Sequence, residues 1–356
     1  MRILIATDAW TPQVNGVVRS LQNTAREAEA LGAHIDFLTP GDFRTLPMPT
    51  YPEIRLALAT PAMVARRMDE IGADFVHIAT EGPIGLLARR VCLTRGRPFT
   101  TSYHTRFPEY LAARAPVPPA LSYAWLRRFH NAGAGIMVST PTLERELRGR
   151  GFGHIMRWSR GVTPTLFHPR PSAEQDGFVA GLPRPVFLSV GRVAVEKNIS
   201  AFLDLDLPGS KVVVGDGPAR AELQAKHPEA HFLGLKQGEA LARIYAAADV
   251  FVFPSLTDTF GIVLLEALAS GLPVAAYPVT GPTDVIGEAP AEAPVGVLDT
   301  DLRRAALAAL EVPRQNARDY ALRFSWKACT EQFLANIHAA QERVTRQERA
   351  PRLKAG

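Results

Sequence analysis

Short β-rich runs alternate with helical patterns along the whole chain, and the series occurs twice. The first half has strand patterns at residues 2–6, 34–38, 74–78, 99–103, 135–138 and 155–158, and the second half at 186–190, 211–214, 231–233, 250–253 and 273–276. Helical patterns lie between them, near 17–31, 61–72, 85–94, 119–131 and 141–149, and then near 197–204, 218–226, 237–247, 261–270 and 301–311. This alternation is typical of parallel sheets with helices on both faces. The sequence therefore predicts an α/β protein with two doubly wound domains.

The length and the distribution of proline predict where the two domains meet. A chain of 356 residues is long for a single core, and proline and polar residues cluster at 167–172. We therefore expect Rossmann-like domains at 1–168 and 169–325, followed by a helix at 326–346 that crosses back to the first domain, and a basic tail to residue 356. Ligands of open α/β sheets bind beyond the carboxyl ends of the strands, so the two domains are expected to face each other across a cleft that holds the site.

Cysteine content and hydropathy indicate the cellular compartment of the protein. The two cysteines, Cys92 and Cys329, match no metal-ligand spacing and suit a reducing cytoplasm. The apolar run after Met1 is too short for a signal peptide, and no stretch of 18 apolar residues is present. We expect a cytoplasmic protein.

The charge is unevenly divided between the two halves. Residues 1–170 carry a net charge of +8 and residues 171–356 a net charge of −3, and the first lysine is Lys197. A basic half favours an anionic partner, either a nucleic acid or an acidic membrane surface. A codon bias toward arginine would explain arginine over lysine but not the division of charge. No helix-turn-helix, RNA-recognition motif or zinc spacing occurs, so we do not expect nucleic-acid binding.

A helix predicted at 261–270 carries one buried charge. Glu266 is its only ionisable residue among leucine, isoleucine, valine and alanine, and a helix that is apolar all round is buried. Asp258 lies in the loop before the helix, whose first N–H groups form an anion site. Two carboxylates beside such a site suit a nucleotide sugar, which offers hydroxyls and a diphosphate. The alternative is that Glu266 pairs with a buried arginine.

This segment, from Asp258-Thr259-Phe260-Gly261 through Glu266, resembles the signature of retaining glycosyltransferases of family 4, which have the GT-B fold. Further matches follow in the family's order over nearly the whole chain: Asn15-Gly16-Val17-Val18, Ser102-Tyr103-His104-Thr105, Arg160-Gly161-Val162, Leu166-Phe167-His168-Pro169, Gly191-Arg192, Glu196-Lys197 and Val214-Gly215-Asp216-Gly217-Pro218. The opening of the chain and Tyr-His-Thr-Arg-Phe-Pro-Glu at 103–109 are most similar to bacterial enzymes that glycosylate membrane lipids. These include sulfoquinovosyl and glucuronosyl diacylglycerol synthases and GDP-mannose-dependent mannosyltransferases.

The resemblance implies a role for each matched residue. Arg192 and Lys197 would bind the donor diphosphate and stabilise its growing charge, Asp258 would hold sugar hydroxyls, and Glu266 would accept hydrogen bonds from the ribose. His104 would lie beside the donor sugar. The implied catalytic set is His104, Arg192, Lys197 and Asp258, and the implied donor-binding set is Gly16, Arg192, Lys197, Gly215, Asp258, Phe260, Gly261, Ile262 and Glu266. Retention would proceed by front-side attack, without a covalent intermediate.

Several of these residues also have ordinary structural interpretations. Arg192 and Lys197 would otherwise be a solvated surface pair, His104 a satisfied core residue, and Gly261 a plain helix-start glycine. The amide of Gly16 would approach the phosphates, or Asn15-Gly16 is only a turn. The family usually has glutamate where this chain has Asp258, and the shorter side chain leaves the identity of the donor sugar open.

Arg106 follows His104 by two positions and suggests a preference for an acidic sugar. A guanidinium group matches a carboxylate in a fork geometry, so we hypothesise that Arg106 binds the C6 carboxylate of a uronic acid donor. A salt bridge between Arg106 and Glu109 is an equal alternative.

We expect neither a cofactor nor a metal. The triplets Asp204-Leu205-Asp206 and Asp299-Thr300-Asp301 look like metal motifs of another glycosyltransferase fold, but both lie away from the proposed diphosphate site. The pattern Gly149-Arg150-Gly151-Phe152-Gly153 lacks the strand-then-helix setting of a dinucleotide fingerprint.

The segment 119–130 is the strongest indication of the acceptor. It combines tryptophan, leucine and phenylalanine with paired arginines, a pattern of helices that lie in a membrane interface. Six arginines would add attraction to anionic lipids: Arg66, Arg67, Arg89, Arg90, Arg95 and Arg97. The alternative is an ordinary core helix with snorkelling arginines.

Together these observations predict a retaining glycosyltransferase, peripheral at the inner face of the plasma membrane. It would move a hexose or hexuronic acid from a nucleotide sugar to a lipid such as diacylglycerol. UDP-glucuronate and UDP-glucose are the favoured donors, and GDP-mannose is the nearest alternative. A nucleotide-sugar hydrolase or epimerase, and a non-catalytic nucleotide-sugar binder, remain the other two classes.

Overall fold

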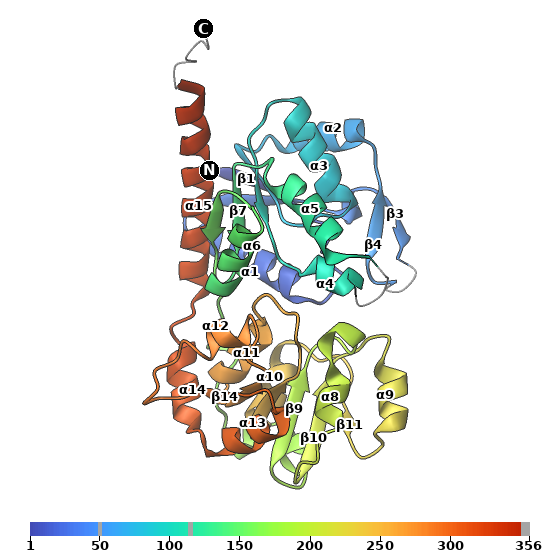
Figure 1. Ribbon diagram of the computed structural model, residues 1–356, viewed down its shortest axis with the longest axis vertical. Helices are drawn as coiled ribbons and strands as arrows, with labels where there is room; N and C mark the ends of the chain where they lie inside the picture. The colour runs from blue at the N-terminus through green and yellow to red at the C-terminus, as the bar shows by residue number, and fades with distance from the viewer. Residues whose placement is uncertain (49–51, 113–116, 350–356) are drawn as a thin grey trace. The chain divides into compact units, whose positions relative to one another are not determined.

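The computed structural model describes residues 1–48, 52–112 and 117–349, and the chain forms two compact units. The first comprises Met1–Ser159 with Lys327–Gly356, and the second comprises Arg160–Trp326 (Figure 1). The change of unit falls at Arg160, before the segment 167–172 where we expected it. The reason is that the intervening residues are bonded to the second unit: the Arg318 guanidinium donates to the carbonyl oxygens of Phe167 (2.8 Å) and Pro164 (3.2 Å).

The first unit contains a six-stranded parallel sheet in the order β2-β1-β5-β6-β7-β8. Its strands are β1 (Arg2–Ala6), β2 (His34–Leu38), β5 (Phe75–Ile78), β6 (Thr100–Ser102), β7 (Gly135–Val138) and β8 (Ile155–Arg157). Its helices are α1 (Gly16–Ala30), α2 (Pro61–Ile71), α3 (Pro83–Thr94), α4 (Phe107–Ala112), α5 (Pro119–His130), α6 (Pro141–Gly149) and α15 (Trp326–Arg349), with the short 3₁₀ turn η1 (Pro40–Asp42).

The second unit contains another six-stranded parallel sheet, in the order β11-β10-β9-β12-β13-β14. Its strands are β9 (Val186–Val190), β10 (Ser210–Val214), β11 (His231–Phe232), β12 (Val250–Phe253), β13 (Val274–Ala276) and β14 (Gly296–Leu298). Its helices are α7 (Gly177–Ala180), α8 (Ile199–Leu203), α9 (Arg220–Lys226), α10 (Gly238–Ala247), α11 (Ile262–Ala269), α12 (Pro282–Val285), α13 (Leu302–Ala308) and α14 (Arg314–Ala321), with 3₁₀ turns η2 (Ser172–Glu174), η3 (Val195–Lys197) and η4 (Ala309–Glu311). The predicted pair of doubly wound α/β units is therefore confirmed.

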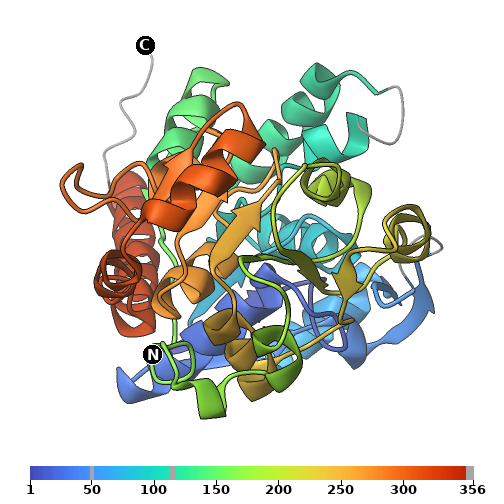
Figure 2. The ribbon, with the colours of Figure 1, turned by 90° about the horizontal axis from the view of Figure 1, so that it is seen from below.

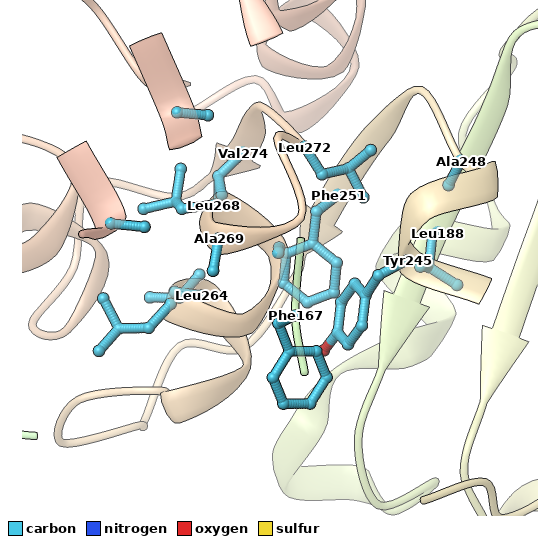
Figure 3. Close-up of a cluster of buried hydrophobic side chains, with 14 of the residues drawn as sticks. Phe167, Leu188, Tyr245, Ala248, Phe251, Leu264, Leu268, Ala269, Leu272 and Val274 are labelled. Atoms are coloured by element: carbon cyan, nitrogen blue, oxygen red, sulfur yellow. The ribbon is translucent and has the colours of Figure 1, made fainter. Parts of the chain in front are cut away.

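Alternation along the central strands gives each face of the second sheet its own core. Leu188 and Phe251 point into a cluster with α10, α11 and α14, whereas Phe187 and Val252 point into a cluster with α8 and α13. Figure 3 shows the first of these clusters, where the rings of Phe251, Tyr245 and Phe167 lie next to one another and side chains of α11 pack on one side of them. Helices therefore cover both faces of this sheet, as the ribbon seen from below also shows (Figure 2). The predicted burial of the apolar helix α11 is confirmed.

In the first unit, helices begin where the sequence provides a side chain that caps the first N–H groups. Thr60 and Thr140 precede prolines at the first helical positions, and their hydroxyls accept hydrogen bonds from Met63 N and Leu143 N. Such a residue satisfies an otherwise unpaired N–H, and the following proline has no N–H to satisfy.

An antiparallel hairpin, β3 (Arg44–Pro47) with β4 (Arg55–Leu58), was not predicted. Its strands are mostly half-buried or exposed, and they interrupt the strand–helix alternation between β2 and α2. The strand β14 and the helices α4, α12 and α14 were also missed, because each is short or lacks a strong apolar period.

The two cysteines provide a test of this fold. Both thiols are buried, and burial raises the pKa of the Cys92 thiol to about 11. Because the thiolate is the reactive form, a two-unit rise lowers its fraction about 100-fold near neutral pH. We expect neither thiol of the native protein to react readily with an aromatic disulfide reagent at pH 8, and both to react after unfolding in guanidinium. Rapid labelling of Cys92 in the native protein would contradict the packing of α3.

Candidate functional site

The predicted residues of the second unit gather where its strand order reverses. The chain moves outward from β9 to β10 and β11 and then returns to β12, which pairs with β9. Arg192 and Lys197 follow β9, and Asp258 follows β12. The carboxyl ends of strands at such a switch point are where open α/β sheets bind ligands.

Several side-chain contacts tie the loop after β9 to the loop after β12. The Asn198 amide nitrogen donates to Pro254 O (3.1 Å), and the Thr257 hydroxyl donates to Glu196 O (3.2 Å). Lys197 Nζ lies 2.5 Å from Asp258 Oδ1. Two predicted site residues, distant in sequence, are therefore in direct contact.

The carboxylate of Asp258 has capacity for another partner. Its Oδ1 pairs with Lys197, while within the described parts of the chain no hydrogen-bond donor reaches its buried Oδ2. An ionised oxygen that is buried in this way is costly unless a donor group reaches it. A ligand hydroxyl would supply that donor.

The start of α11 has no side-chain cap. Gly261, at φ 84°, is the residue before the helix, and Ile262 is its first residue. A side chain at Gly261 would be strained, and its Cβ would crowd Leu264 and Phe253. The first N–H groups of a helix have no acceptor within the helix, so those of Ile262 and Val263 lie at the end of α11 that attracts anions. The next one, Leu264 N, already donates to Gly261 O at 3.0 Å.

Glu266 lies one turn into α11 and is almost fully buried, with 3% of its surface exposed. The Tyr245 hydroxyl, from α10, donates a 3.2 Å hydrogen bond to Glu266 Oε2. We had anticipated either a ligand or a buried arginine as partner, and we had not identified Tyr245. The sequence gives little indication that Tyr245 belongs to the site, because a tyrosine on an amphipathic helix is usually only part of the core.

Gly215 acts by letting two loops approach closely. It has φ 143°, and a Cβ there would lie 1.8 Å from Gly191 O. A Cβ at Gly217 would likewise lie 2.4 Å from Val193 O. Hydrogen bonds from Gly191 N to Val214 O (3.0 Å) and from Val193 N to Asp216 O (2.9 Å) continue the pairing beyond the strands. The position of the loop that carries Arg192 therefore depends on these two glycines.

The remaining predicted residues, Gly16, His104 and Arg106, belong to the first unit. Gly16 begins α1, where the Asn15 side chain already accepts from Val17 N and Val18 N at 3.0 Å. His104 follows β6 by two residues, and its ring lies against the ring of Trp158 with centroids 5.6 Å apart. His104 is therefore at the carboxyl end of the sheet, as expected.

Sequence inspection missed Asp8, which follows β1 at the switch point of the first sheet. Its carboxylate accepts hydrogen bonds from the Thr80 hydroxyl (2.8 Å), Ile84 N (2.8 Å) and Gly85 N (3.2 Å). Burial raises the pKa of Asp8 above its ordinary value, although these hydrogen bonds act in the opposite direction. Asp8 fills the N-terminal end of α3, so this end is closed to an external anion.

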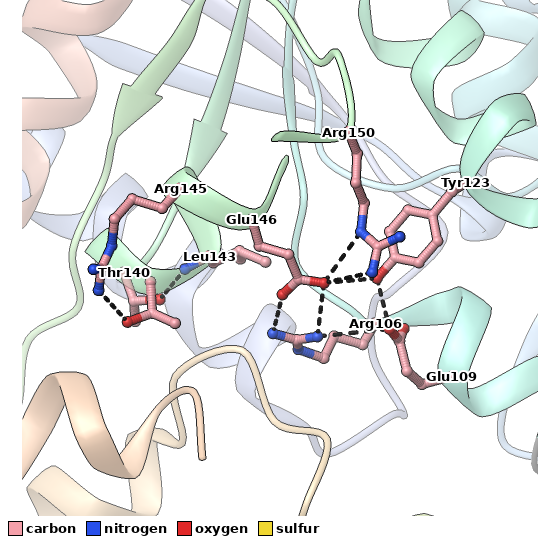
Figure 4. A network of polar contacts seen from close by, with 9 residues as sticks. Arg106, Glu109, Tyr123, Thr140, Leu143, Arg145, Glu146 and Arg150 are labelled. Atoms are coloured by element: carbon pink, nitrogen blue, oxygen red, sulfur yellow. Dashed lines mark hydrogen bonds and ion pairs between the residues drawn. The ribbon is translucent and has the colours of Figure 1, made fainter. Parts of the chain in front are cut away.

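The structure gives Arg106 a partner that we did not predict. Its guanidinium group forms a two-pronged pair with Glu146 of α6, with Nη2–Oε2 at 2.6 Å and Nη1–Oε1 at 3.3 Å (Figure 4). Glu109, the partner considered from the sequence, lies farther away, at 3.6 Å. The guanidinium nitrogens of Arg106, which we expected to bind a sugar carboxylate, therefore bind a carboxylate of the protein itself.

Among the described residues no group of three or more histidine, cysteine or acidic side chains is arranged to hold a metal ion. The acidic triplets have structural roles instead. Asp204 pairs with Lys226 (3.1 Å), Asp299 pairs with Arg304, and Asp301 caps α13.

Two family models match the chain. One, described as Glycosyltransferase Family 4, matches residues 14–166, and the other, described as Glycosyl transferases group 1, matches residues 184–311. A GDP-mannose-dependent alpha-mannosyltransferase of Mycobacterium tuberculosis is 32% identical, over 98% of this chain and 99% of that protein. The sulfoquinovosyl transferase SQD2 of Arabidopsis thaliana is 29% identical over 77% of this chain and 59% of its own length. An alpha-monoglucosyldiacylglycerol synthase of Streptococcus pneumoniae is 27% identical, over 78% of this chain and 71% of that protein.

Solved structures share the fold over nearly the whole chain. A sucrose-phosphate synthase from Thermosynechococcus elongatus superposes with a TM-score of 0.73 at 20% identity, covering 97% of this chain and 98% of the other. The Anabaena protein HepE, in complex with UDP-glucose, superposes with a TM-score of 0.71 at 15% identity, covering 95% of this chain and 100% of the other. The predicted GT-B fold class is confirmed by these neighbours.

Replacing Gly215 by alanine tests how the Arg192 loop is held. The added Cβ would overlap Gly191 O, so we expect Gly215→Ala to lower the free energy of unfolding by about 2–4 kcal/mol. Gly191→Ala is the matched control, because a Cβ at Gly191 meets no atom within 4 Å. Guanidinium titration of the two variants measures the difference. Equal stability would mean that the two loops do not pack as described.

Proposed function

The chain belongs to glycosyltransferase family 4, and from that premise we propose that it transfers a hexose from a nucleotide sugar to a membrane lipid with retention of configuration. It is a transferase that uses a nucleotide sugar. The identity of the sugar and of the acceptor, and the role of each side chain, are our proposal. The observation that carries it is the contact between Lys197 and Asp258 beside the uncapped start of α11.

The second unit is proposed to bind the donor. Arg192 and Lys197 bind the diphosphate, and the first N–H groups of α11 add the field of a helix N-terminus. Asp258 accepts hydrogen bonds from sugar hydroxyls through the buried oxygen that has no partner among the described residues. Glu266, which Tyr245 contacts, accepts hydrogen bonds from the ribose.

Transfer is proposed to occur at the anomeric carbon. The acceptor hydroxyl oxygen forms a bond to that carbon, and the bond from the carbon to the diphosphate oxygen breaks with its electron pair. The proton of the hydroxyl passes to the departing phosphate oxygen. The protein would contribute position and stabilisation of the growing negative charge, through Arg192 and Lys197. His104 would orient the reacting groups from the first unit.

A membrane acceptor is supported by the exposed surface of α3 and α5. Leu121, Trp125 and Arg128 lie at one-turn spacings on α5 and are exposed, and α3 presents Leu86, Arg90 and Leu93 in the same way. Arg89 joins the two helices by donating to Phe129 O and Arg128 O, each at 3.0 Å. Apolar and basic side chains on one helix surface are typical of interfacial binding. We call these six residues, Leu86, Arg90, Leu93, Leu121, Trp125 and Arg128, the interfacial stripe.

The predicted cluster of six arginines is only partly available for lipids. Arg66 pairs with Glu70 (3.6 Å), Arg67 pairs with Asp42 (3.1 Å), and Arg95 pairs with Asp69 (2.5 Å). The lipid attraction is therefore assigned to Arg90 and Arg128 of the stripe. No helix in the described ranges is both long and apolar enough to cross a bilayer.

GDP-mannose is a second candidate donor, and the Mycobacterium tuberculosis relative supports it, because its match extends over almost the entire chain. The argument for a uronic acid donor is weaker than the sequence implied, because Glu146 engages Arg106. UDP-glucose, UDP-glucuronate and GDP-mannose should therefore be compared directly.

Transfer assays with the three radiolabelled donors and extracted membrane lipids, resolved by thin-layer chromatography, test the proposal. We expect one donor to give a labelled lipid, and Arg192→Ala and Asp258→Asn each to lower kcat/KM about 100- to 1000-fold. Asp206→Asn is the control, because the side chain of Asp206 is fully exposed.

Other outcomes would separate the alternatives. Release of nucleotide without an acceptor would indicate a hydrolase, and donor binding without turnover would indicate a binding protein. Full activity in Arg192→Ala or Asp258→Asn would place the donor elsewhere.

Vesicle flotation tests the interfacial stripe. We expect the wild-type protein to float with vesicles that contain phosphatidylglycerol and much less with phosphatidylcholine alone. Arg128→Gln should weaken binding about fivefold, because one basic side chain near an anionic surface is worth about 1 kcal/mol. Trp125→Ala should weaken it as well, whereas Phe178→Ala, which removes an exposed ring from the second unit, should not. Equal flotation with both vesicle types would refute an electrostatic membrane contact.

A further inference from the structure

The loop that carries His104 is short and has several fixed points. It runs from the end of β6 at Ser102 to the start of α4 at Phe107. Tyr103 at its beginning is buried, and its N–H donates to Met137 O of β7 at 3.0 Å. The ring of His104 lies against Trp158. Arg106 is a further fixed point of the loop.

Arg106 connects this loop to α6 by the pair with Glu146. Only 11% of the Arg106 side chain is exposed, and both terminal nitrogens face the two oxygens of Glu146. A two-pronged guanidinium–carboxylate pair fixes direction as well as distance, which a single contact does not. The backbone two residues after His104 is thereby held to a neighbouring helix.

Tyr123 of α5 extends the same network (Figure 4). Its hydroxyl donates to Glu109 Oε1 at 2.6 Å and lies 3.2 Å from Glu146 Oε1. Arg150 lies over the ring of Tyr123, 3.8 Å from its centroid, and pairs with Glu146 at 3.2 Å. Two positive side chains, Arg106 and Arg150, and two negative ones, Glu109 and Glu146, therefore surround the Tyr123 hydroxyl. The network joins the loop to three helices.

The network keeps Glu146 ionised. Burial alone would raise the pKa of Glu146, but hydrogen bonds and charge from Arg106 and Arg150 lower that pKa below its ordinary value. The Arg106–Glu146 ion pair is therefore intact near neutral pH, as a contact that holds the His104 loop in place must be.

We propose that Arg106 and Glu146 are positioning residues that hold the His104 loop in the geometry needed for transfer. The inference rests on the proposed function, in which His104 orients the reacting groups. The two side chains act through His104 and do not touch the donor. Loss of the pair should therefore lower kcat while leaving donor affinity unchanged.

Arg106→Lys keeps the charge but loses the fork, and Glu146→Gln keeps the shape but loses the charge. We expect each to lower kcat about 10- to 100-fold, as a small misplacement of a reacting group does. The donor KM and the Kd of the nucleoside diphosphate measured by titration calorimetry should change by less than about twofold. Glu144→Gln is the matched control, because Glu144 lies on the same helix and is about as exposed as Glu146, but it pairs with Arg148 (2.7 Å) and Arg157 (3.8 Å) and not with the His104 loop. Thermal unfolding of each variant identifies any general loss of structure.

A double-mutant cycle separates positioning from a purely structural effect. If Arg106 acts through His104, Arg106→Lys should cost nothing further in a His104→Ala background. Nitrogen-15 spectra of the histidine rings should show the His104 signal shifted or broadened in Arg106→Lys and unchanged in Glu144→Gln. Additive losses of kcat, or kcat values equal to wild type in both Arg106→Lys and Glu146→Gln, would overturn the inference. Full activity of His104→Ala would overturn the role of His104 and the inference with it, whereas loss of donor binding in Arg192→Ala tests the donor site separately.

Discussion

The candidate donor site depends on the contact between Lys197 and Asp258, which joins the loops after the two central strands of the second sheet. A partly exposed ion pair adds little stability, and the side chains of Asn198 and Thr257 also join the two loops by hydrogen bonds to backbone carbonyls. The value of the pair lies in its chemistry. In the proposed complex a phosphate replaces the carboxylate at Lys197, and sugar hydroxyls replace the ammonium at Asp258. Before the donor binds, the ion pair therefore keeps the side chains of Lys197 and Asp258 oriented for the donor.

Both sheets reverse strand order at equivalent places, yet only one leaves an anion site open there. In the first unit Asp8 occupies the start of α3, and the Asn15 side chain occupies the start of α1. In the second unit α11 begins at Gly261, which has no side chain to offer. A helix N-terminus that already binds a carboxylate cannot also attract a diphosphate. This difference assigns the donor to the second unit in our proposal. The phosphate contact of the Gly16 amide stays a prediction, because Asn15 accepts from Val17 N and Val18 N and not from Gly16 N.

The sequence predicted both sheets and their central strands because apolar runs alternate strongly with helical patterns. The family resemblance placed Lys197 and Asp258 in one donor site, and the structure brings their side chains into contact. The physical reason is that each follows a central strand, and strand ends converge in a parallel sheet. The sequence did not predict the β3–β4 hairpin, where neither strand has a clearly buried face. Tyr245 was missed because its contact with Glu266 joins two different helices, and no local pattern reports such a contact.

Arg106 shows how a motif can locate a residue while its role depends on a distant partner. Its position beside His104 suggested contact with the substrate, but Glu146, 40 residues later, provides the complementary carboxylate. Glu146 has no motif of its own and looks like an ordinary charge on an amphipathic helix. A guanidinium group that is almost wholly buried needs a carboxylate from somewhere, and a substrate present only during turnover cannot supply it in the resting protein. The buried charge therefore favours a permanent partner, and the side chain that aligns a substrate-facing loop need not itself face the substrate.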